Sequence, residues 1–430
     1  MTHKYYLFSL GCKVNAYENN ALGTGFSNMG YEAAAKPEDA DILVLNTCSV
    51  TGKADQKSRQ HISKLRRANP DACLVVMGCY SQLHSEVAKE LGANVVLGSS
   101  KRDEVPSLVE RFFADPKHTP IIEVKKSVRH EDYDELGVTA FTDAARAYLK
   151  IQDGCDNFCS YCLIPTLRGN SRSRKPGEVL REAQALVKDG YKEIIITGIH
   201  IGGYGKDLGD GSYRLADLLE DMLKQNPDLF RLRISSIEES EIDDHFLALL
   251  RDYPNIVDHL HIPLQSGSSS VLQRMRRKYD TDAFIEKIRR IREIRPNIAI
   301  TTDVIAGFPM ESDEEWKETM SFCKEANFSE IHVFPFSSRP GTFAASLKDL
   351  DPSIKKARVH ELLELSKSMR AQYKERFYGK EMEILIEDYD EENHVSTGHT
   401  SNYLLVKILT PEAAHGRVES VIYNSSIAAD

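Results

Sequence analysis

The sequence predicts an α/β protein of three consecutive units: an N-terminal parallel α/β domain, a central domain of six βα units and a small C-terminal β-barrel. Its 430 residues are about three times the length of a typical domain. Over the first two units, short apolar runs alternate with amphipathic stretches, a pattern typical of parallel sheets. From about Phe377 the runs become short, β-rich and separated by turns, which favours a small barrel.

The first unit spans residues 1–114. Three apolar runs predict buried strands, and two amphipathic runs predict helices. The strands are expected at Tyr5–Leu10, Asp41–Thr47 and Cys73–Gly78, and the helices at Ser58–Arg67 and Glu86–Leu91. The polar stretch that follows, residues 115–143, breaks this rhythm and is expected to be a linker.

The second unit spans residues 144–374 and contains six candidate strands separated by helical patterns. They are Ala147–Gln152, Lys192–Gly198, Phe230–Ser236, Val257–Leu264, Ile298–Gly307 and Glu330–Phe336. Six units are too few for a closed eight-stranded barrel, so an incomplete barrel or an open sheet fits. Asp351-Pro352 is expected to start its last helix. Residues 375–430 form the third unit, the small β-barrel.

Composition limits the function classes. The chain is 41% hydrophobic and 28% charged, which excludes a disordered chain, and its net charge of −10 argues against indiscriminate coating of nucleic acid. No apolar run approaches the roughly 20 residues of a membrane span. The first residues lack a signal pattern, so we expect no membrane association and a cytoplasmic location. Eight cysteines in a reducing compartment indicate metal binding or catalysis rather than disulfides.

Three of these cysteines, Cys155, Cys159 and Cys162, follow the first strand of the central unit with C-x3-C-x2-C spacing. They lie where βα barrels place their active sites. Three thiolates without a close fourth cysteine suit a four-iron cluster with one open iron. The alternative is a zinc knuckle completed by the remote His200.

Cys12, Cys48 and Cys79 each follow a strand of the N-terminal domain. Ligand sites of open α/β sheets form along the edge where parallel strands end, so these thiols could converge on one metal cluster. The alternative is three buried small apolar residues. Cys73 begins its strand and lies at the opposite edge, and Cys323 is expected to pack inside a helix face.

The cysteine loop, with Tyr161 before its last cysteine, resembles the radical S-adenosylmethionine superfamily. The motifs Gly11-Cys12-Lys13-Val14-Asn15, Asn46–Thr51 and Gly78–Gln82 resemble those of the methylthiotransferase family. The order of the three units resembles this family as well, so the resemblance covers essentially the whole chain. This resemblance implies a radical partial TIM barrel, a C-terminal TRAM barrel, two [4Fe-4S] clusters and two molecules of S-adenosylmethionine per turnover. One molecule supplies a methyl group to sulfur, and the other generates the radical that activates a C–H bond.

The resemblance also suggests cofactor contacts. The expected contacts are Tyr161, Gly198, Ser235, Ser236, Ile305 and Gly307. Many superfamily members have a glutamate in the loop after the second strand, and residues 197–205 contain none.

Within the family, this sequence looks most like the subgroup that methylthiolates C2 of N6-threonylcarbamoyladenosine at position 37 of tRNA. The alternatives are isopentenyladenosine tRNA or an aspartate of a ribosomal protein as substrate, or a non-catalytic, metal-stapled RNA-binding protein. If the chain is such an enzyme, the resemblance implies a tRNA anticodon loop, a sulfur donor and an electron donor as partners.

Local charge favours RNA despite the acidic total. Residues 53–67 carry a net charge of +5 and residues 168–175 one of +4. Arg172 or Arg174 could also pair with the carboxylate of a threonylcarbamoyl group. The alternative for such runs is a solvated helix face. The expected RNA contacts are Lys53, Arg59, Arg66, Arg67, Arg168, Arg172 and Arg174.

Overall fold

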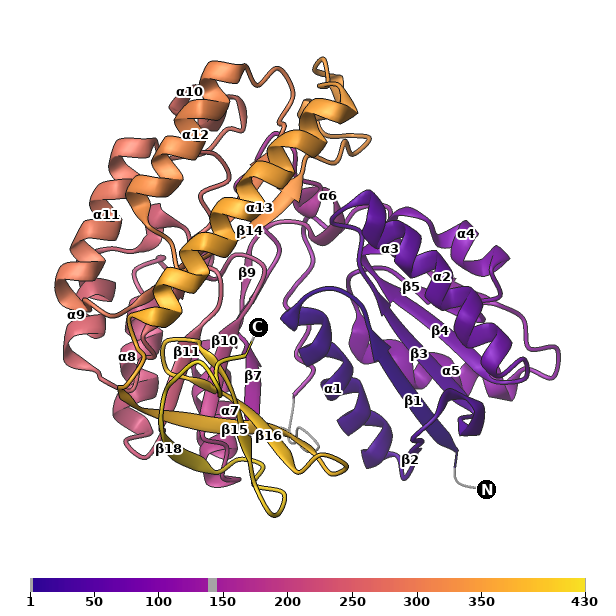
Figure 1. Cartoon of the computed structure of the whole chain (residues 1–430). Coiled ribbons are helices and arrows are strands. Elements are labelled where there is room, and N and C mark those ends of the chain that lie inside the picture. The colour runs from indigo at the N-terminus through magenta and orange to yellow at the C-terminus, as the bar shows by residue number, and fades with distance from the viewer. Residues whose placement is uncertain (1–2, 138–144, 430) are drawn as a thin grey trace.

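The computed structural model describes residues 3–137 and 145–429, and Figure 1 shows its three units. The expected linker residues 138–143 and the expected boundary at residue 144 lie outside the described residues. The α/β class and the order of the units are as the sequence predicts.

The N-terminal unit is a parallel six-stranded sheet in the order β2-β1-β3-β4-β5-β6. Every residue of the central strands β3 and β4 is buried, as in parallel sheets with helices on both faces. Helices α1 and α5 pack on one face, and α2, α3 and α4 on the other. The strands are β1 (Lys4–Ser9), β2 (Glu32–Ala33), β3 (Ile42–Thr47), β4 (Cys73–Gly78), β5 (Val95–Leu97) and β6 (Ile121–Glu123). The helices are α1 (Lys13–Asn28), α2 (Gly52–Ala68), α3 (Cys79–Leu83), α4 (Ser85–Glu90) and α5 (Val105–Ala114), with 3-10 turns at Pro37–Asp39 and Arg102–Glu104.

The stretch after residue 114 is not a plain linker, which corrects the prediction. Ile121–Glu123 forms β6 and pairs with β5, so the sheet extends past the expected boundary. Tyr133 Oη donates to the carbonyl of Lys150 at 3.0 Å, and Asp134 pairs with Arg102 at 2.8 Å. This polar stretch therefore packs onto both units.

The central unit contains the six predicted strands in chain order. Strands β11-β10-β7 and β12-β13-β14 form two parallel sheets, which the bridges Leu232–Ile256 and Ser236–His261 connect. The strands are β7 (Arg146–Lys150), β10 (Glu193–Thr197), β11 (Arg231–Ile234), β12 (His259–His261), β13 (Ala299–Ala306) and β14 (Glu330–Pro335), with a short hairpin of β8 (Gln152–Asp153) and β9 (Arg172–Ser173). The helices are α6 (Ile164–Arg168), α7 (Pro176–Lys188), α8 (Leu215–Gln225), α9 (Asp244–Asp252), α10 (Ser269–Arg274), α11 (Thr281–Ile294), α12 (Asp313–Ala326) and α13 (Pro352–Glu375), with 3-10 turns at Ile201–Gly203, Glu239–Glu241 and Phe343–Ser346.

Sequence signals start the last two long helices. Ser312 accepts from the backbone N–H of Glu315, whose carboxylate accepts from the N–H of Ser312, so the predicted capping box is formed at α12. Asp351 accepts from the N–H of Ser353 and caps α13, with Pro352 in its first turn.

Among the described residues, β14 and β7 do not pair, so the barrel is incomplete and open between its first and last strands. The N-terminal unit covers this opening. Tyr17 and Ala21 of α1 join the barrel core on the β7 side. On the β14 side, the N–H of Gly52 donates to Ser337 Oγ at 3.2 Å, and Arg339 donates to Ser49 Oγ at 2.9 Å.

The C-terminal unit is a curled antiparallel sheet in the order β17-β16-β15-β18, which Figure 1 shows in yellow as a half-barrel. Its strands are β15 (Glu381–Asp390), β16 (Val395–Thr400), β17 (Leu405–Leu409) and β18 (Val418–Ile422). It packs at the end of the barrel where the strands begin, because Arg146 pairs with Glu387 at 2.6 Å and Arg231 donates to the carbonyl of His399 at 2.9 Å. No helix of the described residues is both long and apolar enough to cross a bilayer.

Candidate functional site

The three N-terminal cysteines lie at the carboxyl ends of neighbouring strands. Cys12 follows β1, Cys48 follows β3 and Cys79 follows β4, and β1-β3-β4 are adjacent in the sheet. Gly11 has φ +98°, and a Cβ placed there would lie 2.9 Å from Cys48 Sγ. A glycine is therefore required for the Cys12 loop to approach Cys48. The structure brings these three thiols together, and all are free.

The chemistry of this group fits a metal cluster. Burial raises the pKa of the Cys48 thiol to about 11, so the thiol stays protonated at neutral pH unless a metal displaces the proton. Arg168 Nε donates to Cys79 Sγ at 3.4 Å, and Arg168 Nη2 donates to Asn15 Oδ1 at 2.8 Å. A cation and a hydrogen bond at a cysteine sulfur stabilise a thiolate there and tune an iron–sulfur cluster that it holds.

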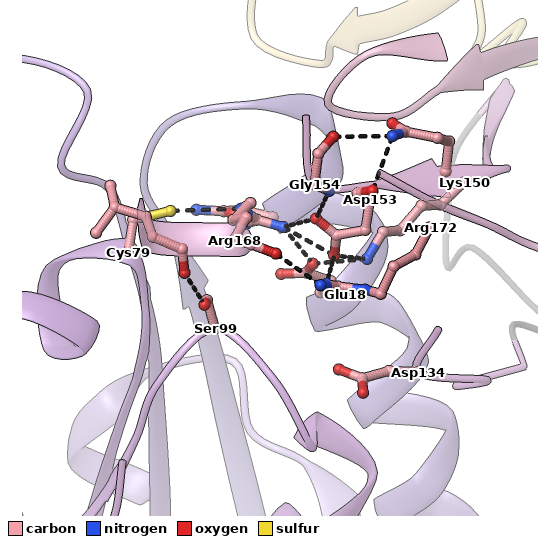
Figure 2. Close-up of polar contacts among 12 residues, drawn as sticks. Glu18, Cys79, Ser99, Asp134, Lys150, Asp153, Gly154, Arg168 and Arg172 are labelled. Atoms are coloured by element: carbon pink, nitrogen blue, oxygen red, sulfur yellow. Dashed lines mark hydrogen bonds and ion pairs between the residues drawn. The ribbon is translucent and has the colours of Figure 1, made fainter. Parts of the chain in front are cut away.

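Arg168 is also the centre of a buried ion-pair network between the two units, shown in Figure 2. Its Nη1 donates to Glu18 Oε1 at 3.0 Å and to Asp153 Oδ1 at 3.1 Å. Lys150 Nζ lies 3.0 Å from the same Glu18 oxygen and 2.7 Å from Asp153 Oδ2. Arg102 pairs with the other Glu18 oxygen at 3.1 Å. Burial alone would raise the pKa of Glu18, but Arg102, Arg168 and Lys150 more than offset it and lower the pKa to about 2.

This network carries a surplus of positive charge beside the thiols. Its cations are Arg102, Lys150, Arg168 and Arg172, and its carboxylates are Glu18, Asp134 and Asp153. The net charge of +1 lies next to Cys79, where thiolates would carry negative charge.

The second cysteine group lies at the end of β7 and β8. Backbone N–H groups of Asn157 and Ile164 donate to the sulfurs of Cys155 and Cys162, each at 3.4 Å. Arg277 Nη1 donates to Cys159 Sγ at 3.3 Å. Each cysteine group thus has one buried arginine on a sulfur, and both donor sets fit an iron–sulfur cluster.

His200 and Glu241 join this group, and sequence reasoning missed Glu241. His200 Nε2 lies 2.6 Å from Glu241 Oε1, and Asn157 Nδ2 lies 3.1 Å from the same nitrogen. Burial opposes protonation, but hydrogen bonds with Cys155 and Glu241 raise the pKa of His200 to about 10. In this structure His200 Nε2 is therefore already engaged by Glu241 and Asn157. A Cβ at Gly202 would overlap Glu241 Oε2, so a glycine is required where this carboxylate packs against the loop.

A cavity of about 210 Å³ is lined by residues that neighbour Cys48 and Cys162 in the chain and by strand ends of the barrel. Val50 and Thr51, just after Cys48, form its N-terminal wall. Tyr161, from the cysteine loop, and Ile305 line the barrel side, and their role as cofactor contacts stays a prediction. The other lining residues are Gln265, Asp303, Phe334, Pro335, Phe336 and Ser337.

The other expected cofactor contacts lie around the barrel mouth. Gly198 follows β10, and Ser235 and Ser236 follow β11, with Ser236 exposed. Gly307 is buried with φ +75°, and its N–H donates to Glu311 Oε2 at 3.0 Å. These four positions remain predictions for the cofactor.

Three of the predicted RNA contacts are buried, so the prediction that they lie at the surface is wrong. Arg168 and Arg174 are 1% and 3% exposed, and Arg172 is 6% exposed. Arg174 pairs with Glu182 at 2.5 Å, and Arg172 donates to the carbonyl of Arg168 at 2.7 Å. Because all three guanidinium groups are buried and engaged by protein carboxylates and carbonyls, they cannot contact phosphates of an RNA.

Most of the RNA contacts predicted on the basic helix α2 do lie at the surface. Lys53, Arg59 and Arg67 are exposed along it. Arg66 is the exception, because its guanidinium donates to the carbonyls of Gly92, Pro70 and Ala72 and holds the loop after the helix.

An exposed aromatic rim that the charge count missed lies at the cysteine loop. Phe158 and Phe343 are 47% and 50% exposed, and the guanidinium of Arg276 lies 4.6 Å from the Phe343 ring centroid. The segments are adjacent, since the N–H of Ser160 donates to the carbonyl of Met275 at 3.0 Å, and its carbonyl accepts from the N–H of Ala344 at 2.7 Å. Single exposed aromatics carry no pattern in a sequence, so only the fold shows that they gather here.

Comparisons with known proteins agree with this geometry. The family model of the radical SAM superfamily matches residues 149–323, and the model described as uncharacterized protein family UPF0004 matches residues 4–98. Threonylcarbamoyladenosine tRNA methylthiotransferase MtaB of Bacillus subtilis (strain 168) is 43% identical over 418 residues, 96% of this chain and 92% of that protein. The chain belongs to the radical S-adenosylmethionine methylthiotransferase family. It is an enzyme, which contradicts the alternative of a non-catalytic, metal-stapled RNA-binding protein.

Other relatives of this methylthiotransferase are named for a different substrate. The tRNA-2-methylthio-N(6)-dimethylallyladenosine synthase of Bacillus pumilus (strain SAFR-032) is 35% identical, over 97% of this chain and 83% of that protein. Among solved structures, the radical S-adenosylmethionine methyltransferase TsrM from Kitasatospora setae matches with a TM-score of 0.57, 15% identity, and coverage of 78% of this chain and 75% of that one. This last likeness supports the fold. Methylthiotransferases of this family use S-adenosylmethionine and two [4Fe-4S] clusters.

Proposed function

We propose that this enzyme adds a methylthio group to C2 of N6-threonylcarbamoyladenosine at position 37 of tRNA. The observation that carries the proposal is the cavity whose wall contains Thr51, near Cys48, and Tyr161, beside Cys162. A base placed there would lie against residues that adjoin one cysteine of each group. The 43% identity to the threonylcarbamoyladenosine enzyme, against 35% to the dimethylallyladenosine enzyme, supports the choice of substrate.

Each cysteine group would hold one cluster, Cys12, Cys48 and Cys79 the first, and Cys155, Cys159 and Cys162 the second. When bound, the clusters and S-adenosylmethionine supply the sulfur, the methyl group and the one-electron chemistry that an aromatic C–H bond requires. Arg168 and Arg277 hold positive charge on one sulfur of each group. Tyr161, Ile305 and Phe336 give the cavity apolar walls. A sulfur donor and an electron donor are the further partners of this reaction.

The tRNA would approach over α2 and the aromatic rim. Lys53, Arg59 and Arg67 offer charge for phosphates, and α2 starts immediately after the Thr51 wall of the cavity. Phe158 and Phe343 offer faces on which unpaired bases stack. An anticodon loop is single-stranded, so its target base can leave the stack at low cost.

The test is anaerobic reconstitution followed by a competition assay. Two transcripts of one tRNA are mixed, one carrying threonylcarbamoyladenosine and the other isopentenyladenosine, and nucleosides are identified by mass spectrometry. We expect the methylthio product from the first alone. Efficient conversion of the isopentenyl tRNA, or of a ribosomal protein while both tRNAs stay unchanged, would refute the substrate assignment.

A further inference from the structure

A chain of polar side chains runs along the inner face of the barrel. On β13, Thr301 and Asp303 are two residues apart and therefore share the face on which Asp303 lines the cavity. His259 and His261 lie two residues apart on the neighbouring strand β12, and His261 is paired in register with Thr301. Arg233 of the next strand, β11, contacts His259. The chain thus leads from the start of β12 to the cavity.

The donors and acceptors of this chain fix its direction. Arg233 donates through Nε and Nη2 to Glu193 at 2.6 and 3.1 Å, and through Nη1 to His259 Nδ1 at 3.4 Å. A guanidinium has no acceptor, so Nδ1 of His259 accepts and its Nε2 carries the hydrogen. Burial and the nearby Arg233 hold the pKa of His259 well below its usual range, so this imidazole is neutral.

The same accounting continues through Thr301. Its Oγ1 lies 3.0 Å from His259 Nε2 and 2.9 Å from His261 Nδ1. Oγ1 accepts from His259, and the single hydroxyl hydrogen of Thr301 is donated to His261 Nδ1. The other nitrogen of His261, Nε2, therefore carries a hydrogen, and it lies 3.3 Å from Asp303 Oδ2. Asp303 thus meets a donor at one of its two oxygens.

The C-terminal unit covers the other end of the chain. The ring of Tyr403, in the turn between β16 and β17, stacks on His259 with centroids 4.5 Å apart, and His259 is 6% exposed. Tyr403 has φ +66°, a left-handed conformation that a non-glycine residue adopts at a cost. Ser401 holds the same turn, because its Oγ accepts from the N–H of Asp258 at 2.9 Å. His259 therefore keeps one orientation.

A divalent cation is the alternative partner of this group. His332 of β14 is paired in register with Asp303, and one ligand atom each of His261, Asp303 and His332 lies within 4.8 Å of the others. Two imidazoles and a carboxylate can bind iron or zinc. Ligation by His261 Nε2 would move its hydrogen to Nδ1, and the Thr301 hydroxyl would then lose its acceptor among the described residues. The hydrogen bonds therefore favour a donor and an acceptor over a metal site.

We propose that Arg233, His259 and Thr301 are positioning residues, which fix the tautomer of His261 and leave Asp303 Oδ1 free to accept from a hydroxyl group of a nucleoside in the cavity. Within residues 3–137 and 145–429, Oδ1 of Asp303 has no side-chain or backbone partner. A ribose hydroxyl is a donor that S-adenosylmethionine and the target nucleotide share. The inference rests on the proposed function for a nucleoside in the cavity, and adds the residues that hold it.

The test measures how strongly the reconstituted enzyme distinguishes a hydroxyl from a hydrogen, without reductant and hence without turnover. One arm compares S-adenosylmethionine with its 2′-deoxy and 3′-deoxy analogues. The other compares an anticodon stem-loop whose target nucleotide has ribose with one that has 2′-deoxyribose there. The wild type should bind one hydroxyl form about 10- to 100-fold more tightly, as expected for a hydrogen bond to a carboxylate. The arm that shows this preference identifies the source of the hydroxyl.

Substitutions along β13 then test the chain. Asp303→Asn should remove most of the preference. Thr301→Val, which removes the hydroxyl and keeps the side-chain shape, should reduce it about 3- to 10-fold, and Thr301→Ser should restore it. Thr302→Val is the matched control, because Thr302 is also buried and its hydroxyl donates to the carbonyl of Ile262 at 2.7 Å. It should lower the stability and leave the preference unchanged. The preference is a ratio of dissociation constants, so it does not depend on the fraction of protein that folds.

The remaining outcomes overturn the proposal. A preference that survives Thr301→Val, or that Thr302→Val reduces equally, would show that the chain does not act on Asp303. A wild type without a preference in either arm would show that Asp303 holds no hydroxyl. Stoichiometric binding of Zn²⁺ that Asp303→Asn removes would make the group a metal site. The competition assay alone decides which nucleoside is methylthiolated, so this subsite can fail while the proposed function stands.

Discussion

Replacing Arg168 by alanine should destabilise the protein more than a surface substitution does. The side chain is 1% exposed and forms hydrogen bonds with Glu18, Asp153 and Asn15 in addition to Cys79. Removing one partner of a buried ion pair costs about 3–5 kcal/mol, because the remaining charge loses its compensation. Glu18 and Asp153 each keep Lys150, at 3.0 and 2.7 Å, so we expect the lower end, about 3 kcal/mol.

The assay is urea unfolding, followed by the fluorescence of Trp316, the single tryptophan of the chain. Arg289→Ala is the control: Arg289 is an exposed helix residue that pairs with Glu325 at 3.0 Å, and its loss should stay within about 0.5 kcal/mol. Arg168→Lys keeps the charge but not the forked geometry, and should fall between the two. A loss below about 1 kcal/mol for Arg168→Ala would refute the view that this network joins the two units.

Arg168→Lys has a second readout, the reduction potential of a cluster at Cys79. The hydrogen bond from Arg168 to Cys79 favours the more negative, reduced state of such a cluster. Arg168→Lys keeps the charge and loses this hydrogen bond, so in a protein with alanine at Cys155, Cys159 and Cys162 it should lower the reduction potential of the remaining cluster. Arg102→Lys is the matched control, because Arg102 is equally buried in the same network and has no contact with a cysteine. Equal shifts in both variants would contradict a direct effect on Cys79.

Three further expectations follow from the site. Alanine at Cys155, Cys159 and Cys162 should leave the iron content of one cluster and abolish deoxyadenosine formation. Cys73→Ala, a change in the sheet core, should keep the full iron content. Loss of half the iron in Cys73→Ala would contradict the assignment of the ligands to strand ends. Arg59→Ala should lower the salt slope of tRNA binding by roughly 0.7–0.9, and the buried Arg172 should contribute nothing to that slope; the reverse result would return Arg172 to the RNA surface. The lowered pKa of Glu18 stabilises the fold above its unfolded pKa of about 4.5, so stability should fall as the pH drops from there toward about 2, and Glu18→Gln should flatten that profile.

Periodicity alone located most of the fold. The six central strands alternate with amphipathic helices, so their existence and parallel order follow from pattern and connection rules. The same rules placed Cys12, Cys48 and Cys79 at one sheet edge, because parallel strands end on the same side. Strand β6 was not predicted, because a three-residue edge strand in a polar stretch has too few apolar positions to show the two-residue period of a strand.

Arg168, Arg172 and Arg174 show where a prediction from neighbouring residues alone fails. A charge count over residues 168–175 finds four cations and no acid, and predicts that they lie at the surface. Their partners, Glu18 and Glu182, come from α1 and α7, and only the packed fold brings them into contact. Glu241 is similar: it reaches His200 from a turn 41 residues later, and nothing between them signals the approach.

The buried ion-pair network also restricts how the substrate can enter. Separating the N-terminal unit from the barrel would bring Glu18, Arg168 and Lys150 into water one after another, and each lost contact raises the barrier. Hinge opening of the kind that admits ligands to two-domain proteins is therefore unfavourable here. The nucleotide instead has to reach its cavity while the two units stay joined, so the walls at Thr51 and at Tyr161 act as one preformed site.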